Sequence, residues 1–234
     1  MTNRTLLFAS IATLTFAGCK DPAEGTQKAE VAEAATVEAE APKPEQETLP
    51  ISSENSKITF VGSKVTGKHD GGFNDFKGTI QLNPEDFTAS RLQVEIDMNS
   101  VWSDNERLTG HLKTGDFFLV EEHPTATFTS TEIKEGGAEG ASHTITGNLT
   151  MRGVTKSVTF PANITVGENE VSASSTFALP RKQFGVAYAG APDDLIRDDV
   201  IITLDVKAPR NGAQPATAPA QQDAGAEMPA PAAE

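Results

Sequence analysis

The chain has 234 residues, a formal net charge of −14 and a single cysteine. One cysteine excludes a disulfide framework within the chain, so the fold must be stable through its hydrophobic core. The acidic balance argues against anionic partners such as nucleic acid or a bare anionic membrane surface.

The N-terminal segment has the pattern of a bacterial lipoprotein signal. Arg4 precedes an apolar run, residues 6–16, which is long enough for a signal-peptide core and too short to cross a bilayer as a mature helix. The run ends at Ala17-Gly18-Cys19, which resembles the site where signal peptidase cuts and the cysteine thiol is acylated. We therefore expect residues 1–18 to be a lipoprotein signal peptide and Cys19 to be the lipid attachment site. An ordinary secretory signal with an incidental cysteine is the alternative.

Acylation of Cys19 predicts a membrane-anchored, extracytoplasmic protein. A diacylglyceryl group with an added N-acyl chain such as palmitate supplies more than the two lipid signals that stable anchoring needs. Lys20, rather than Asp, follows the cysteine. By resemblance to lipoprotein sorting signals, this implies delivery to the outer membrane, on its periplasmic or surface side.

Composition marks a linker and a tail around one domain. Residues 19–49 are rich in Ala, Glu and Pro and contain no aromatic residue, and residues 209–234 are rich in Ala and Pro. Neither stretch has enough apolar side chains to offset the entropy of ordering. We expect both to be disordered, the first as an acidic tether with a reach of roughly 30 Å. Residues 50–208 remain as one domain.

Alternation of apolar and polar side chains within residues 50–208 predicts an all-β domain of half-buried antiparallel strands. Turn clusters such as Gly71-Gly72 separate the strands. Closing such a sheet into a barrel removes its edges, and a two-sheet sandwich is the competing architecture. The eight predicted strands lie near residues 57–66, 73–82, 91–98, 125–133, 144–151, 158–166, 171–179 and 200–206.

A stretch dense in ionisable groups, HLKTGDFFLVEEHP at residues 111–124, lies between two of these strands. Apolar residues four apart predict a short helix over residues 104–112. We interpret the whole stretch as a lid over one end of the barrel, with Phe117 and Phe118 packed inward, rather than as an active site.

The groups that could serve in catalysis or metal binding are scattered along the sequence. His69, His111, His123 and His143 fall in separate predicted loops or strand edges, whereas nucleophilic catalysis needs an adjacent base and a third, orienting group. The acidic residues within 193–199 lack the ligand spacing and the glycine of a calcium loop. We predict no enzyme activity, no metal site and no cofactor.

Four motifs, in this order and spacing, resemble the YceI-like family of secreted polyisoprenoid-binding proteins. The resemblance covers nearly all of residues 51–208. It implies a lipocalin-like, eight-stranded antiparallel barrel with an apolar pocket for an isoprenoid chain, such as a quinone tail, or another long amphiphile. The motifs are ITFVGSKVTGKHDGGFNDFKGTI at 58–80, HLKTGDFFLVEEHPTATFTST at 111–131, ITGNLTMRGVTKSVTFPA at 145–162 and LPRKQFGVAY at 179–188.

Strand alternation indicates which side chains point into the lumen of such a barrel. The same alternation is expected of side chains that fill a solid core, so it does not tell whether the inside is hollow. Candidate ligand-binding residues are Phe60, Val94, Ile96, Phe118, Phe128, Phe160, Ala162, Phe177 and Leu204.

Three functional interpretations stay open. The preferred one is a lipid-anchored protein that binds or carries an isoprenoid-like lipid and has no nucleic acid partner. The sequence does not predict its oligomeric state. The second is an envelope or stress module with a filled barrel. The third is a small-barrel isomerase or cyclase, which ionisable residues with shifted pKa values inside the lumen would favour.

Substitution of the single cysteine tests the anchor. Cys19→Ser should move the protein from the membrane fraction to the soluble fraction, because the thiol that carries the lipid is gone. Fractionation followed by immunoblotting measures the distribution, and an unchanged distribution contradicts the prediction.

Overall fold

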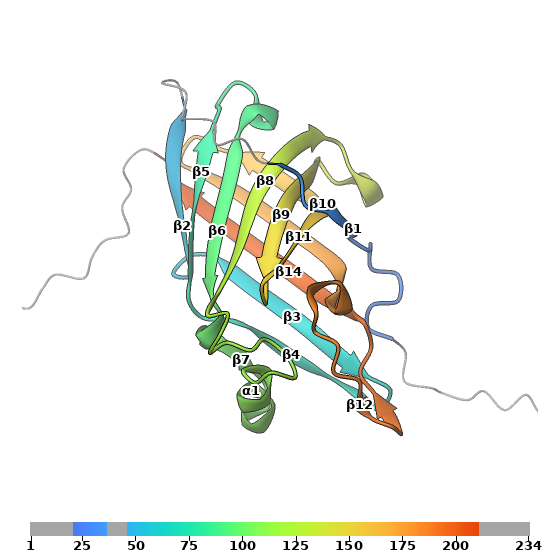
Figure 1. Ribbon diagram of the computed structural model, residues 1–234. Helices are drawn as coiled ribbons and strands as arrows, with labels where there is room; N and C mark the ends of the chain where they lie inside the picture. Colours follow the sequence, from blue (N-terminus) through green and yellow to red (C-terminus); the bar gives the residue numbers. More distant parts are fainter. Residues whose placement is uncertain (1–20, 37–45, 211–234) are drawn as a thin grey trace, which may run out of the picture.

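A computed structural model describes residues 21–36 and 46–210 and confirms a mostly β fold with one short helix in that part of the chain (Figure 1). The helix α1 is Glu106–Leu112, and short 3-10 helices lie at Phe87–Ala89 (η1), Met98–Ser100 (η2), Ala138–Gly140 (η3) and Arg181–Phe184 (η4). The strands are β1 Glu30–Glu33, β2 Glu47–Ser52, β3 Lys57–Lys64, β4 Gly67–Phe73, β5 Phe76–Leu82, β6 Arg91–Asp97, β7 Val101–Ser103, β8 Thr125–Glu135, β9 His143–Met151, β10 Val154–Val166, β11 Glu170–Pro180, β12 Gly190–Ala191, β13 Asp194–Leu195 and β14 Asp199–Pro209.

The main sheet is strongly curled, and the chain itself joins the first strand of its hydrogen-bonded path to a strand near the other end. The order is β2-β5-β6-β8-β9-β10-β11-β14-β3-β4-β7, and β2 and β3 are consecutive in the chain. Figure 1 shows β5, β6 and β8 on one wall with β14 and β3 crossing behind them. The structure is therefore a barrel and not a two-sheet sandwich. Its strands outnumber the predicted eight, because β1, β2, β7, β12 and β13 lie outside the predicted ranges and β4 shares only Phe73 with one of them.

The barrel closes where β14 meets β3. Residues 201–205 of β14 pair with residues 57–61 of β3. Beyond this ladder β2 diverges from β14, and the buried Ser56 hydroxyl takes over as hydrogen-bond partner of Lys207. It accepts from the Lys207 N–H at 3.0 Å and donates to its carbonyl at 3.3 Å. The backbone groups at the end of the ladder thus stay paired.

The expected disorder of residues 19–49 and 209–234 is wrong where the structure describes them. β1 pairs with β10, and β2 begins at Glu47. Arg210, just past β14, donates from Nε to a Glu47 carboxylate oxygen at 3.0 Å. Backbone hydrogen bonds and ion pairs to the barrel order these segments, and composition does not report such contacts. Cys19 and the expected signal peptide lie outside the described residues.

Gly71 and Gly72, expected in a turn, lie inside β4. A Cβ atom on Gly71 would lie 2.4 Å from Cζ of Phe60, the residue opposite it on β3. The glycine is therefore needed because an aromatic ring lies across the strand at this position.

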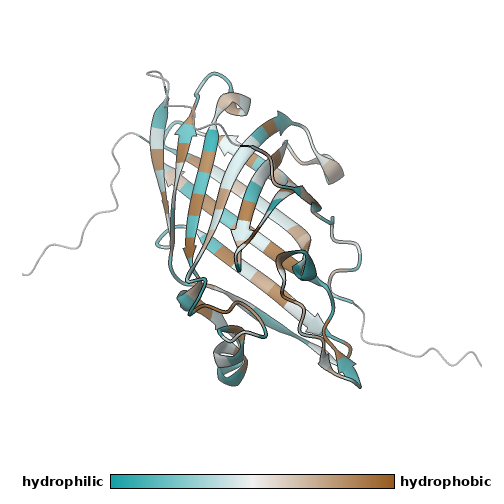
Figure 2. Cartoon of the chain, viewed as in Figure 1, coloured by the Kyte–Doolittle hydropathy of each residue, from teal (hydrophilic) through white to brown (hydrophobic). Residues whose placement is uncertain are grey.

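The alternation predicted for the strands is confirmed in β6, where Leu92, Val94 and Ile96 are half-buried and the intervening positions are exposed apart from the terminal Arg91. Figure 2 shows the corresponding alternation of hydrophobic and hydrophilic bands along the strands. Apolar side chains from these faces form the core inside the barrel.

The predicted lid lies at the end of the barrel that carries α1 (Figure 1). Asn105 caps α1 by accepting from the Leu108 N–H at 3.0 Å. Phe117 is 6% exposed and packs with Val101, Leu112 and Val186. Phe118 is half-buried, and its ring centroid lies 6.0 Å from that of Phe73. The pair is thus packed inward, as predicted.

Truncation of the lid residue Phe117 should destabilise the protein. Phe117→Ala should lower the free energy of unfolding by about 3 kcal/mol, because it leaves a cavity in a buried cluster. Leu195→Ala, at an exposed hairpin, is the control and should change it by less than about 0.5 kcal/mol. Urea denaturation measures both, and equal effects of the two substitutions contradict the lid.

Candidate ligand-binding cavity

The barrel encloses an apolar cavity of about 150 Å³. Every lining side chain in this described part of the chain is aliphatic, aromatic or methionine. Six of the predicted lumen residues line it, from β6, β8, β10, β11 and β14: Val94, Ile96, Phe128, Phe160, Phe177 and Leu204.

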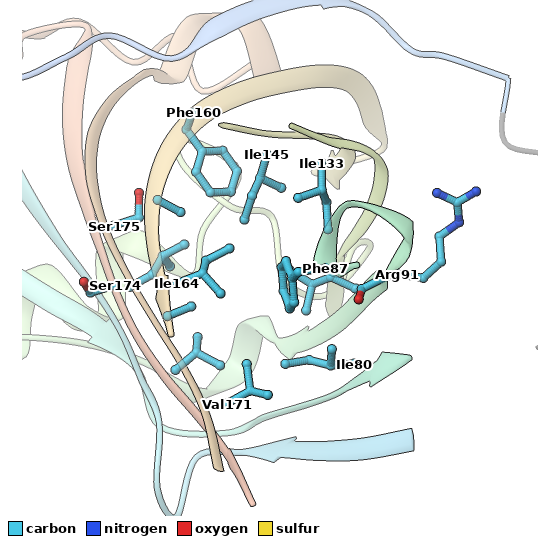
Figure 3. A pocket seen from close by; sticks show the side chains of 16 residues that line it. Ile80, Phe87, Arg91, Ile133, Ile145, Phe160, Ile164, Val171, Ser174 and Ser175 are labelled. Carbon is cyan, nitrogen blue, oxygen red and sulfur yellow. The ribbon is translucent and has the colours of Figure 1, made fainter. Parts of the chain in front are cut away.

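A second apolar cavity of about 50 Å³ lies next to the first, and Ala162 lines it. Figure 3 shows Phe160, Ile145 and Phe87 pointing into this space, whereas the Arg91 guanidinium points away from it. The two cavities share part of their walls. The shared residues are Leu92, Phe160, Leu204 and Val206.

Two predicted lumen residues line neither cavity. Phe60 and Phe118 instead flank Phe73, at ring-centroid distances of 5.9 and 6.0 Å. Phe73, the last residue of β4 before the break to β5, lines the main cavity instead of these two residues. Alternation places Phe60 on the same face of β3 as Ile58, which lines the cavity, but it does not show that the cavity ends before Phe60.

Sequence reasoning named no other residue of the main cavity as a binding candidate. Several of the omitted lining residues lie on apolar strand faces that the sequence shows, and extending the alternation along each strand finds them. The remainder come from β2, from β3 and from strand ends. The omitted residues are Ile51, Ile58, Phe73, Phe76, Leu92, Met98, Ala126, Leu149, Met151, Val158, Leu179, Ile202 and Val206.

Aromatic rings form one side of the cavity. Phe160 and Phe177 are stacked, with ring centroids 4.5 Å apart and an interplanar angle of 15°. Phe128 lies 5.8 Å from Phe160 and covers Gly147 of β9, where a Cβ atom would come within 2.4 Å of its ring. The missing side chain at Gly147 lets this ring lie against the wall instead of further into the lumen.

Ionisable groups do not line the main cavity. His69 and His111 lie elsewhere on the surface, 2.8 Å from the carboxylates of Asp104 and Asp116 respectively. The hydrogen bond from His69 lowers the pKa of Asp104. Among the described residues, His, Cys, Asp and Glu side chains do not gather in groups of three or more that could hold a metal ion. The cavity thus offers apolar contact and shape, and no polar chemistry.

A buried arginine orders the loop after β11, beside the lid. Arg181 is 5% exposed and donates to the carbonyls of Val186, Arg197 and Ile196 at 2.6, 3.0 and 3.3 Å. Burial lowers the pKa of Arg181, and the nearby charge of Asp198 opposes this shift. The arrangement is structural, since the guanidinium faces carbonyls and not the cavity.

A small antiparallel barrel with a lid and a wholly apolar cavity is typical of proteins that bind hydrophobic ligands. Residues 50–208 match the YceI-like domain, and the chain belongs to this family. The match confirms the resemblance seen in the sequence motifs. Within the described residues, no helix has the length and hydropathy needed to span a membrane.

Individual relatives align with part of the chain. A UPF0312 protein of Pseudomonas aeruginosa is 44% identical over 123 residues, which are 50% of this chain and 62% of the relative. A UPF0312 protein of Pectobacterium atrosepticum is 41% identical over 100 residues, which are 43% of this chain and 50% of the relative. The chain thus spans less than two thirds of the length of these curated relatives.

Two solved structures share the fold. BcnA of Burkholderia cenocepacia has a TM-score of 0.60 and 22% identity, and the alignment covers 68% of this chain and 99% of that one. A polyisoprenoid binding domain from Saccharophagus degradans, implicated in plant cell wall breakdown, has a TM-score of 0.55 and 15% identity, with coverage of 70% and 98%. At these identities the likeness concerns the fold alone.

Filling the space under Phe128 should disturb the cavity wall. Gly147→Ala should destabilise the protein by about 1 to 3 kcal/mol, because the new Cβ overlaps the Phe128 ring and a backbone oxygen. Gly62→Ala, where nothing lies within 4 Å of the new atom, is the matched control and should have little effect. Chemical denaturation measures both, and equal stability of the two variants would show that the ring does not depend on the glycine.

Proposed function

We propose that the protein binds a polyisoprenoid or similar long-chain amphiphile in the barrel lumen, and that it carries or sequesters this lipid while anchored to a membrane through Cys19. The observation that supports the proposal most directly is the main cavity, whose lining is entirely apolar. Membership of the YceI-like family supports it, as does the ligand named for the structurally similar Saccharophagus degradans domain.

The size of the cavities bears on how a chain is held. An apolar cavity of about 150 Å³ suffices for a group the size of benzene, so a longer chain needs both cavities joined. Leu92 and Leu204 line both cavities, so a long chain would require these and further lining side chains to move aside, which breaks no backbone hydrogen bond of the sheet. Burial of each methylene contributes about 0.8 kcal/mol, so affinity grows with chain length without specific polar contacts.

Binding accounts for the site better than catalysis does. An isomerase or cyclase acting on a bound lipid needs an acid, a base or an electrophile at the reacting atoms, and the main cavity presents none of these side chains. The filled-barrel alternative is less well supported, because free volume is present inside the barrel.

The anchor and the extracytoplasmic location are the second part of the proposal, and the ordered N-terminal segment refines them. The Asp21 carboxylate pairs with Arg197 at 2.9 Å. Cys19 is two residues earlier, a chain distance of at most about 7 Å. An acylated Cys19 therefore holds the barrel close to the membrane surface, rather than on the flexible tether expected from composition.

Native mass spectrometry tests the binding function. The full-length chain with Cys19→Ser, incubated with the isoprenoid alcohol geranylgeraniol, should show one added ligand mass that organic extraction removes. Val94→Trp and Ala162→Phe should each abolish the adduct, because both enlarge side chains that line the cavities.

The matched control is Gln93→Trp, one residue from Val94 on the outer face of β6. Gln93 is exposed, so this variant should keep the adduct. Circular dichroism checks that all variants keep their strands. A folded wild-type chain that takes up neither geranylgeraniol nor an isoprenoid quinone contradicts the proposal and favours the envelope module.

A further inference from the structure

Strands β10 and β11 pair over only part of their length. Residues 163–166 of β10 pair with residues 171–174 of β11, although both strands continue well beyond this ladder. We call the unpaired stretch, residues 154–162 of β10 facing residues 175–180 of β11, the β10–β11 split. It is a discontinuity in the wall of the barrel.

Pro161 accounts for where the ladder ends. A proline has no N–H to donate to a neighbouring strand. Its carbonyl accepts a hydrogen bond from the Ser175 hydroxyl of β11, a side-chain contact in place of a ladder bond. From this point towards Val154, β10 and β11 need other partners for their backbone groups.

The N-terminal segment supplies those partners. Residues 30–33 of β1 pair antiparallel with residues 156–159 of β10. On the other side, the Ala29 N–H donates to the Ala178 carbonyl at 2.9 Å, and the Ala178 N–H donates to the Gln27 carbonyl at 2.8 Å. Residues 27–33 therefore lie in the split as an inserted strand, and Figure 1 shows β1 beside β10 and β11.

The split lies directly over the cavity. The main cavity is lined from both sides of the split, by Val158 and Phe160 of β10 and by Phe177 and Leu179 of β11. The stacked rings of Phe160 and Phe177 bridge the two strands beneath the inserted segment. An outer groove of about 190 Å³ runs beside residues 27–30, and Phe160 lines this groove as well as both internal cavities.

The inserted segment is held more weakly than the lid. Ala29 is buried and Val31 partly buried, whereas the other residues of β1 are exposed. In the ion pairs of Lys28 with Asp199 and of Glu33 with Lys156, the partner on the inserted segment is exposed and the partner on the barrel is half-buried. Pairs with one side chain in solvent contribute little. The lid end, by contrast, has Val101, Leu112 and Phe117 buried together. Segments with few buried apolar contacts open at low free-energy cost.

We propose that residues 27–33 form a displaceable strand that closes a lateral portal between β10 and β11, and that the hydrophobic chain of the ligand enters and leaves the lumen through this portal. Displacement of the segment together with rotation of Phe160 opens the cavity to the outer groove. The inference rests on the proposed function, because it names the entry route of that same site.

A reversible crosslink tests the portal. Glu30 and Thr159 are paired residues of β1 and β10 that both line the outer groove. In the full-length chain with Cys19→Ser, the pair Glu30→Cys and Thr159→Cys should form a disulfide that fixes the segment in place. Stopped-flow fluorescence with cis-parinaric acid, a fluorescent long-chain fatty acid, should show uptake about tenfold slower or more in the oxidised form, and reduction should restore the rate.

The matched control crosslinks the barrel away from the split. Gln93→Cys with Thr129→Cys joins paired residues on the outer face of β6 and β8, and its oxidation should leave the uptake rate unchanged. Lys156→Gln, which removes the partner of Glu33, should speed uptake by about two- to fivefold.

The outcomes separate the portal from the function. Probe uptake at equal rates in the oxidised and reduced Glu30/Thr159 pair overturns the portal and leaves lipid binding intact. Equal slowing in the Gln93/Thr129 control also overturns it, because rigidity of the barrel would then be the cause. Failure of the probe to bind even the reduced chain overturns the proposed function and, with it, the portal.

Discussion

The apolar lumen depends on one constraint: the barrel wall must satisfy its backbone hydrogen bonds wherever the strands bend or diverge, since an unpaired N–H or C=O facing an apolar cavity is costly. Buried serine hydroxyls meet this constraint at breaks in the ladders. Where β10 and β11 separate too widely for one hydroxyl, an inserted strand completes the pairing. The serine contacts are Ser56 with Lys207, Ser90 with Asn83, Ser130 with Leu92 and Ser175 with Pro161.

The parts of the fold that the sequence predicts are those governed by a period of two. A strand with water on one side and lipid-like surroundings on the other must alternate, so Val94 and Ile96 of β6 could be placed in the lumen from their spacing alone. The rule fails at breaks, because a break changes which side chains face inward. At the break between β4 and β5, for example, Phe73 and Phe76 both line the cavity although they are three residues apart. The period of two also predicts Phe60 in the lumen but does not show that the cavity ends before it, and the pair Gly71-Gly72 predicts a turn although Gly71 lies under the Phe60 ring.

Two further features have no periodic signature. Whether a lumen is hollow depends on the fit of large side chains in three dimensions, such as the Phe128 ring over Gly147 from the neighbouring strand. The second feature is that β1 is ordered at all, which depends on partners far away in the chain. Its Ala and Glu residues are poor strand formers in isolation. They form a strand here because the backbone edges of β10 and β11 offer hydrogen-bond partners.

The inserted strand also constrains how the barrel assembles. Ala35, just after β1, binds the side chain of Asn148, which is 113 residues away, so the segment that is synthesised early must wait for most of the domain before it finds its place. Such long-range pairing is slow. Until it forms, β10 and β11 present open edges to other chains. Because a second copy carries the same β1 sequence, that edge also fits a neighbour's strand, and exchange of β1 between copies is a route to a strand-swapped dimer when the concentration is high enough to compete with the tethered strand.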